Sequence, residues 1–202
     1  MDKFVKNLKR RKTKGVFNPW FDRDHENDAS AEAPKQRLDN LKQYLEERRK
    51  ADYLLLAEAL GYQGGHFTGI PMTSERIITG KKSESGILPG YVCSTKLYRT
   101  SNLKKHPDGF NEPTATIVWQ KLISEDLDTR KFVFWNAFPW HPYKAEKGLL
   151  SNRTPMNSEM QEGLPVLNGL LNDFNFKKII ALGNKAHETL KRLGIKTEKV
   201  RH

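Results

Sequence analysis

The stretch from Phe132 to Pro155, FVFWNAFPWHPYKAEKGLLSNRTP, constrains the fold more than any other part of the chain. It begins with an apolar run, Phe132–Trp135, that is typical of a buried β-strand. The run breaks at Asn136, and three prolines stiffen the loop that follows. A buried strand that ends in a polar amide and continues into a rigid, aromatic loop is typical of a binding crevice at the edge of an α/β sheet.

Apolar runs alternate with helical patterns along most of the chain. Strands are expected at 52–57, 132–136, 178–182 and 196–200. The first is too apolar to alternate, which indicates a parallel strand that is covered on both faces. Helices are expected at 36–50, 72–80, 112–124, 156–174 and 185–193. The order predicts an α/β fold, a three-layer α/β/α sandwich with a central, mostly parallel four-stranded sheet.

Three segments interrupt this regularity. Gly163 and Pro165 are expected to divide the helix at 156–174. Residues 81–111 are rich in Gly, Lys, Ser and Pro, which predicts a long surface excursion around a strand at 91–93. Residues 1–36 are expected to form a basic N-terminal arm and an irregular segment, and residues 37–202 the domain. The arm could add phosphate contacts, or it could be a solvated tail.

The charge and the cysteine content limit the classes of function that the protein can have. The 202 residues include 35 Lys and Arg against 24 Asp and Glu, a formal net charge of +11. This favours a polyanionic partner, with nucleic acid first and an anionic membrane surface second, although many basic proteins do not bind DNA. The single cysteine, Cys93, excludes a disulfide scaffold, a Cys-rich zinc site and a four-Cys iron–sulfur cluster within one chain. We expect no metal and no cofactor.

The sequence also predicts the cellular compartment and the oligomeric state. No apolar run approaches the roughly 20 residues needed to span a membrane, and the N-terminus lacks the apolar segment of a signal peptide. We expect a monomer in a reducing cytoplasm, without a membrane partner.

Three strand-end loops together resemble those of the uracil-DNA glycosylase superfamily. AEALG at 57–61, followed by FTGIP at 67–71, resembles the G-E-A-P-G…F-x-G loop of the bacterial and archaeal enzymes. Asn136 followed by NRTP at 152–155 resembles their strand-end asparagine and Pro-rich loop. IALGNKA at 180–186 resembles a later strand-to-helix turn, and VRH at 200–202 falls where the family has a His-Pro-Ser loop. The resemblance covers about residues 38–202.

The resemblance implies a DNA repair enzyme that flips uracil out of DNA and hydrolyses its N-glycosidic bond without a metal. A carboxamide at Asn136 can donate to O4 of uracil and accept from N3–H. Phe67 stands where the family stacks the base. Backbone N–H groups near Glu58 and Ala59, together with the His202 imidazole, would stabilise the uracilate at O2. The implied catalytic residues are Glu58, Asn136 and His202, and the implied substrate-binding residues are Ala57, Ala59, Gly61, Phe67 and Asn136.

Four departures from the family pattern are visible. Ala59 stands where the best-known members have an aspartate, as it does in the E-A-P-G branch, so Glu58 is the only carboxylate of this loop. Leu60 replaces the usual proline. One cysteine cannot hold the iron–sulfur cluster usual in the E-A-P-G branch, which implies a cluster-free branch. The family continues beyond the histidine with Pro-Ser and a wedge that enters the duplex, so either the C-terminal part is truncated or the resemblance fails there.

Structural explanations compete with each functional one. Asn136 could cap a turn, Phe67 could be a core aromatic, and Glu58 could accept backbone N–H groups. His141 invites a role as an acid or a ligand, but a lone histidine is more often packed or solvated. Two other functions stay open. One is a non-catalytic nucleic-acid-binding protein that keeps the glycosylase fold, which Ala59 favours. The other is an α/β enzyme that acts on a nucleotide or another small phosphorylated ligand.

Overall fold

The computed structural model, which describes residues 2–9 and 13–200, is built on a four-stranded parallel sheet. The strand order is β3-β2-β5-β6, with strands at Phe132–Phe138, Tyr53–Ala59, Lys178–Leu182 and Glu198–Val200. Central strand β2 pairs in parallel with β3 on one side and β5 on the other. The expected parallel sheet is confirmed, and its apolar strands β2 and β3 extend slightly beyond the expected ends.

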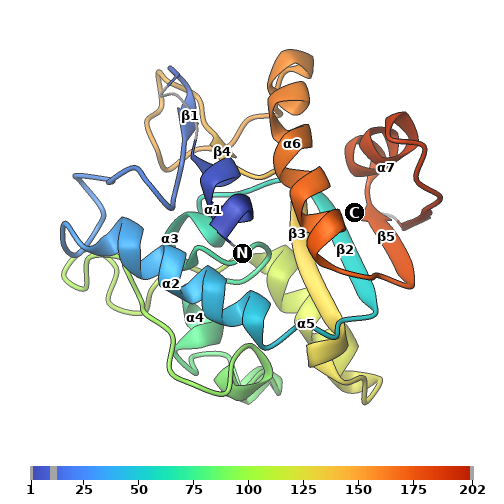
Figure 1. The fold of residues 1–202 in the computed structure, drawn as a ribbon. Coiled ribbons are helices and arrows are strands. Elements are labelled where there is room, and N and C mark those ends of the chain that lie inside the picture. The colour runs from blue at the N-terminus through green and yellow to red at the C-terminus, as the bar shows by residue number, and fades with distance from the viewer. Residues whose placement is uncertain (1, 10–12, 201–202) are drawn as a thin grey trace.

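Helices cover both faces of the sheet (Figure 1). Neighbouring residues of a strand point to opposite faces. Phe134 of β3 contacts Trp119 of α5 (Pro113–Ser124), with ring centroids 4.8 Å apart. Trp135 instead contacts Phe4 of α1 (Asp2–Leu8) at 5.4 Å and Trp20 at 6.0 Å. Helix α6 (Asn157–Asp173) packs on β3 and α1, and α7 (Asn184–Arg192) packs on β5. The expected α/β architecture is thus confirmed.

Helix α2 (Ala33–Glu46) and the residues after it close the outer edge of the sheet at β3. The Phe134 N–H donates to the Tyr44 hydroxyl at 2.8 Å, and Arg48 Nε donates to the Phe132 carbonyl at 2.9 Å. Every residue of β3 is buried even though β3 is the last strand of the sheet on this side. An unsatisfied buried backbone group would cost about 1–3 kcal/mol. These side chains therefore let an edge strand lie in the core.

The division expected in the helix at 156–174 is wrong, because α6 runs without a break through Pro165. Gly163 explains its path. A Cβ atom at Gly163 would lie 2.7 Å from the Ala137 carbonyl oxygen and 3.0 Å from Pro139 Cδ. The missing side chain lets the helix approach the end of β3 closely, and this packing holds the helix despite its unfavourable residues. Gly163 is a packing residue and does not end a helix.

The N-terminal residues pack on the domain. Phe4 and Leu8 of α1 are buried in the core, and Trp140 Nε1 donates to the Leu8 carbonyl at 2.9 Å. The two-residue strand β1 (Val16–Phe17) pairs antiparallel with β4 (His141–Pro142). A boundary at residue 36 stays a prediction, but side chains from both parts share one core. Positions 10–12, part of the expected basic arm, lie outside the described residues.

The segment at 81–111 contains 3-10 turns, η1 (Ser83–Ser85) and η2 (Pro89–Tyr91), so the strand expected at 91–93 is wrong. Its backbone carbonyls are held by side chains, since the Tyr91 carbonyl accepts from Thr129 Oγ1 at 2.8 Å. The remaining short elements are α3 (Gly65–Thr68), α4 (Glu75–Ile78) and η3 (Thr129–Lys131). Within residues 2–9 and 13–200, no helix combines the length and apolar character needed to cross a bilayer.

Candidate active site

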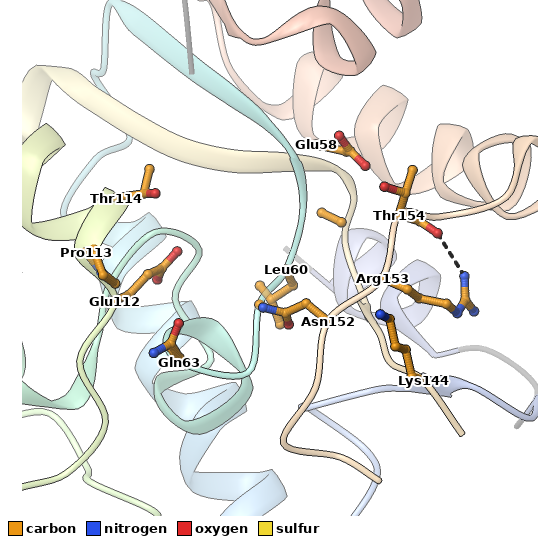
Figure 2. A pocket seen from close by; sticks show the side chains of 12 residues that line it. Glu58, Leu60, Gln63, Glu112, Pro113, Thr114, Lys144, Asn152, Arg153 and Thr154 are labelled. Atoms are coloured by element: carbon orange, nitrogen blue, oxygen red, sulfur yellow. Dashed lines mark hydrogen bonds between the residues drawn. The ribbon is translucent and has the colours of Figure 1, made fainter. Parts of the chain in front are cut away.

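A pocket of about 590 Å³ lies where β2 ends (Figure 2). Its volume is in the range of small-ligand sites, and the carboxyl end of a parallel strand is where α/β sheets usually bind ligands. Glu58 and Thr154 lie on one side of the pocket, and Gln63 and Glu112 lie on the other. The lining residues are Glu58, Ala59, Leu60, Gly61, Gln63, Glu112, Pro113, Thr114, Lys144, Asn152, Arg153 and Thr154.

The loop after β2 is fixed at both of its ends. Near the pocket, the Tyr62 N–H donates to Asn152 Oδ1 at 3.1 Å, which joins this loop to the NRTP segment. At the far end, Gly69 has φ of +74°, and a Cβ atom there would overlap the Arg37 carbonyl. Only glycine fits this left-handed position. Trp20 Nε1 donates to the Gly69 carbonyl at 3.0 Å, so the N-terminal segment also holds the loop.

The NRTP segment is clamped to the start of α6. Arg153 donates from Nη1 and Nη2 to the two carboxylate oxygens of Glu159, both at 2.7 Å. The same carboxylate accepts the Met156 N–H at 2.8 Å, and Arg153 Nη2 also donates to the Gly15 carbonyl at 2.9 Å. The Glu159 carboxylate raises the pKa of the Arg153 guanidinium above its usual value. Arg153 therefore positions the pocket wall, and its Nη1 bond to the Thr154 carbonyl is drawn in Figure 2.

A buried chain of ionisable groups joins the two loops behind the pocket. His66 Nδ1 lies 3.0 Å from His141 Nδ1, and His66 Nε2 lies 3.2 Å from Asp24 Oδ2. His141 Nε2 is 2.8 Å from the Ser151 carbonyl, which can only accept. His141 Nε2 must therefore carry a proton, and in neutral His141 Nδ1 accepts from His66. Burial, helped by nearby His66, lowers the pKa of His141 to about 3. His141 is thus a packed, neutral histidine.

Glu112 is a pocket residue that sequence reasoning did not single out. It immediately precedes α5 but makes no capping hydrogen bond with its side chain. Its Oε2 atom is enclosed and has no hydrogen-bond partner within the described part of the chain. Burial raises the pKa of Glu112 to about 7. The sequence signal, an acid directly before Pro113, is typical of many helix starts and indicates no pocket.

The sequence-predicted site residues fall into two sets. Glu58, Ala59 and Gly61 line the pocket together. Phe67 does not line it, because its ring is fully buried and stacks on Phe110 with centroids 4.2 Å apart and planes 5° apart.

Two further predicted residues lie in the sheet, and one lies outside the described residues. Asn136 is 2% exposed and does not line the pocket. It is paired with Ala57, which is also buried, in the register of β2 and β3. The Asn136 Oδ1 atom has no hydrogen-bond partner in residues 2–9 and 13–200. His202 lies outside the described residues.

The described residues offer no obvious metal or thiol chemistry. Among them, no group of three or more His, Cys, Asp and Glu side chains could hold a metal ion. Cys93 is buried, and burial raises the pKa of its thiol to about 11. A thiol with such a pKa is a poor nucleophile at neutral pH.

No protein-family model matches the chain, and no curated protein resembles it in sequence. Among solved structures, the crystal structure of wild-type Pedobacter heparinus SMUG2 is similar, with a TM-score of 0.59 and 16% sequence identity. The match covers 100% of this chain and 86% of SMUG2, which is a member of the uracil-DNA glycosylase superfamily. The chain therefore has the α/β fold of SMUG2.

Proposed function

We propose that the protein is a DNA repair glycosylase that hydrolyses the N-glycosidic bond of uracil, or of a related deaminated base, after the nucleotide flips out of DNA. The observation that carries the proposal is the pocket at the end of β2, in a chain with this fold. Two loops that resemble glycosylase motifs line the pocket, although they lie far apart in the sequence. They are AEALG at 57–61 and NRTP at 152–155. The net charge of +11 favours a polyanionic substrate.

The extruded base is proposed to lie with Glu58 and Thr154 on one side and Gln63 and Glu112 on the other, and with backbone N–H groups near Ala59 facing its O2 atom. Asn136 is proposed to read the base edge. Its unpartnered Oδ1 is a buried acceptor, and such atoms are costly unless a ligand donates to them. The N3–H of uracil is a suitable donor. Because Asn136 does not line the unliganded pocket, this contact requires the pocket to deepen when the base binds.

Lys144 supplies positive charge for the DNA backbone. It is exposed and lines the pocket beside the clamped NRTP segment. A phosphate next to the flipped nucleotide would lie within reach of a lysine at such a pocket rim, and each such contact makes binding weaker at higher salt. Phe67 is proposed to stack on the base only if its ring first separates from the Phe110 ring.

The direct test measures abasic-site formation on single- and double-stranded oligonucleotides that contain one uracil, with matched thymine and cytosine oligonucleotides as controls. We expect cleavage of uracil alone or of uracil together with hypoxanthine. Glu58→Gln and Asn136→Ala should lower the single-turnover rate by at least about 100-fold, as expected when a transition-state contact is lost. Glu188→Gln and Asn172→Ala, at exposed helical positions, are the matched controls.

The outcomes separate the proposed functions. Tight, salt-dependent DNA binding without cleavage would contradict the catalytic proposal and support a binding protein with the glycosylase fold. Stabilisation by a mononucleotide without salt-dependent DNA binding would instead support an enzyme of small phosphorylated ligands. If Glu58→Gln and Asn136→Ala leave the activity unchanged, the proposal of an enzyme would stand, but the assignment of the site would be refuted.

A further inference from the structure

Glu112 is a carboxyl group in the pocket wall for which the proposed chemistry has no role so far. We propose that Glu112 is a further catalytic residue, which carries a proton in the resting enzyme and donates it in a hydrogen bond to a carbonyl oxygen of the departing base. This inference rests on the glycosylase function proposed above. Three observations carry it: the position of the carboxyl group, the lack of a partner for one of its oxygens, and the shape of the facing loop.

The facing loop is shaped to receive this carboxyl group. A Cβ atom at Gly64 would overlap Glu112 Oε2 and would lie 2.7 Å from the carboxyl carbon, but 3.5 Å from Oε1. Oε2 therefore lies against the glycine backbone, and Oε1 is the oxygen farther from the loop. Glu112 lines the pocket, across from Glu58 and beside Gln63 (Figure 2). Of the two oxygens, Oε1 is the one left to meet a ligand.

The surroundings of Glu112 favour the protonated form. The enclosed Oε2 accepts no hydrogen bond from any described residue, and no ion pair neutralises the carboxylate there. An ionised carboxylate that loses water without gaining a donor or a cation is strongly disfavoured. Burial alone accounts for a pKa raised to about 7. At neutral pH and below, much of the protein therefore carries a neutral carboxyl group in this wall.

A neutral carboxyl group suits the charge that develops during hydrolysis. When the C1′–N1 bond breaks, its electron pair stays with the base, and the negative charge spreads onto the base oxygens. An O–H donor at one of those oxygens stabilises this charge, whereas an ionised carboxylate would repel it. Water adds its oxygen to C1′ and its released proton ends on the base, so Glu112 is unchanged over the cycle.

The test compares Glu112→Gln with Glu112→Ala across pH 5.5–8.5, using single-turnover cleavage of uracil DNA. Gln has the shape of the protonated acid and keeps an N–H donor, but it does not titrate. We expect wild-type activity to fall by up to about tenfold per pH unit above the pKa near 7. Glu112→Gln should keep at least a third of the wild-type activity at low pH. Its activity should not fall as the pH rises above 7. Glu112→Ala should lose about 100-fold. Glu84→Gln, at an exposed position, should leave the profile unchanged.

A second readout separates a chemical role from a structural one. Fluorine stabilises the anion of 5-fluorouracil, so its departure depends less on a donor in the pocket. Glu112→Ala should therefore lose at least about tenfold less activity on 5-fluorouracil than on uracil, whereas a merely misfolded pocket would lose both equally. Thermal melting of each variant checks folding, and Glu112→Gln keeps the test valid if Glu112→Ala does not fold.

The possible failures are distinguishable. If the wild-type protein cleaves no uracil DNA at any pH, the proposed function fails, and with it the role of Glu112 in that reaction. If the wild-type protein is active but Glu112→Gln keeps the fall above pH 7, Glu112 is not the titrating group. If Glu112→Gln is as inactive as Glu112→Ala, a hydrogen-bond donor at this position is not sufficient and the donor role is refuted.

Discussion

Glu159→Gln tests how firmly the NRTP segment is held against α6. Both oxygens of Glu159 accept from Arg153 at 2.7 Å, and the carboxylate also accepts the Met156 N–H. A hydrogen bond to a charged group contributes about 1.5–3 kcal/mol. The glutamine side chain keeps one acceptor oxygen but turns an N–H group toward the Arg153 guanidinium. It also removes the negative charge that pairs with the guanidinium. The Arg153 side chain is 21% exposed, so solvent screens part of the loss.

These terms predict a loss of about 2 kcal/mol in the free energy of unfolding, or about 4–8 °C in Tm for a chain of this size. Urea denaturation followed by tryptophan fluorescence gives the free energy, and Glu188→Gln is the control for removing a carboxylate from an exposed helical position. A double-mutant cycle with Arg153→Met measures the interaction energy between the two side chains. This energy should account for most of the lost stability. A loss below about 0.5 kcal/mol, equal to that of the control, would refute the clamp.

Other perturbations follow from the same structure. Tyr44→Phe should destabilise the protein by about 1–3 kcal/mol, because the buried N–H of Phe134 loses its acceptor; an unchanged urea midpoint would contradict this. Gly163→Ala should lower Tm through its clash with a β3 carbonyl, whereas Gly169→Ala, whose added Cβ has no atom closer than 3.5 Å, should be neutral or stabilising by up to about 1 kcal/mol. The pKa of His141 is lowered to about 3, so the unfolded chain takes up its proton first and stability should fall as pH drops from about 6.5 toward 3. His141→Gln should reduce that slope in urea titrations by up to about 1.4 kcal/mol per pH unit, and an unchanged slope would rule out His141 as its source.

The sheet could be predicted from the sequence because most of β2 and all of β3 are buried. Such strands must be apolar throughout, and the runs at 53–57 and 132–135 leave little choice of structure. The loops at the strand ends could be predicted because their residue types resemble a known family. Glu58, Ala59 and Gly61 accordingly lie together at one pocket.

The rest depends on contacts that no local pattern records. Phe4 and Leu8 are spaced for one face of a helix, but the surrounding lysines favour a basic arm or a solvated tail. Gly163 could equally end a helix or let it approach a strand, and only the position of β3 decides between these. Glu112 owes its raised pKa to burial, and its carboxyl group lies against Gly64, in a loop far away in the sequence.

The N-terminal contacts of the pocket loops have a consequence for the order of folding. Trp140 Nε1 bonds the Leu8 carbonyl across 132 residues of chain, and Arg153 bonds the Gly15 carbonyl across 138. Contacts between residues so far apart must overcome a large loop-closure entropy, and they slow folding. During synthesis, the segment near Leu8 must wait for most of the chain before its partners exist. The pocket should therefore be among the last features to form, so an incompletely folded chain would already carry its basic residues but would lack a pocket that could hold a ligand.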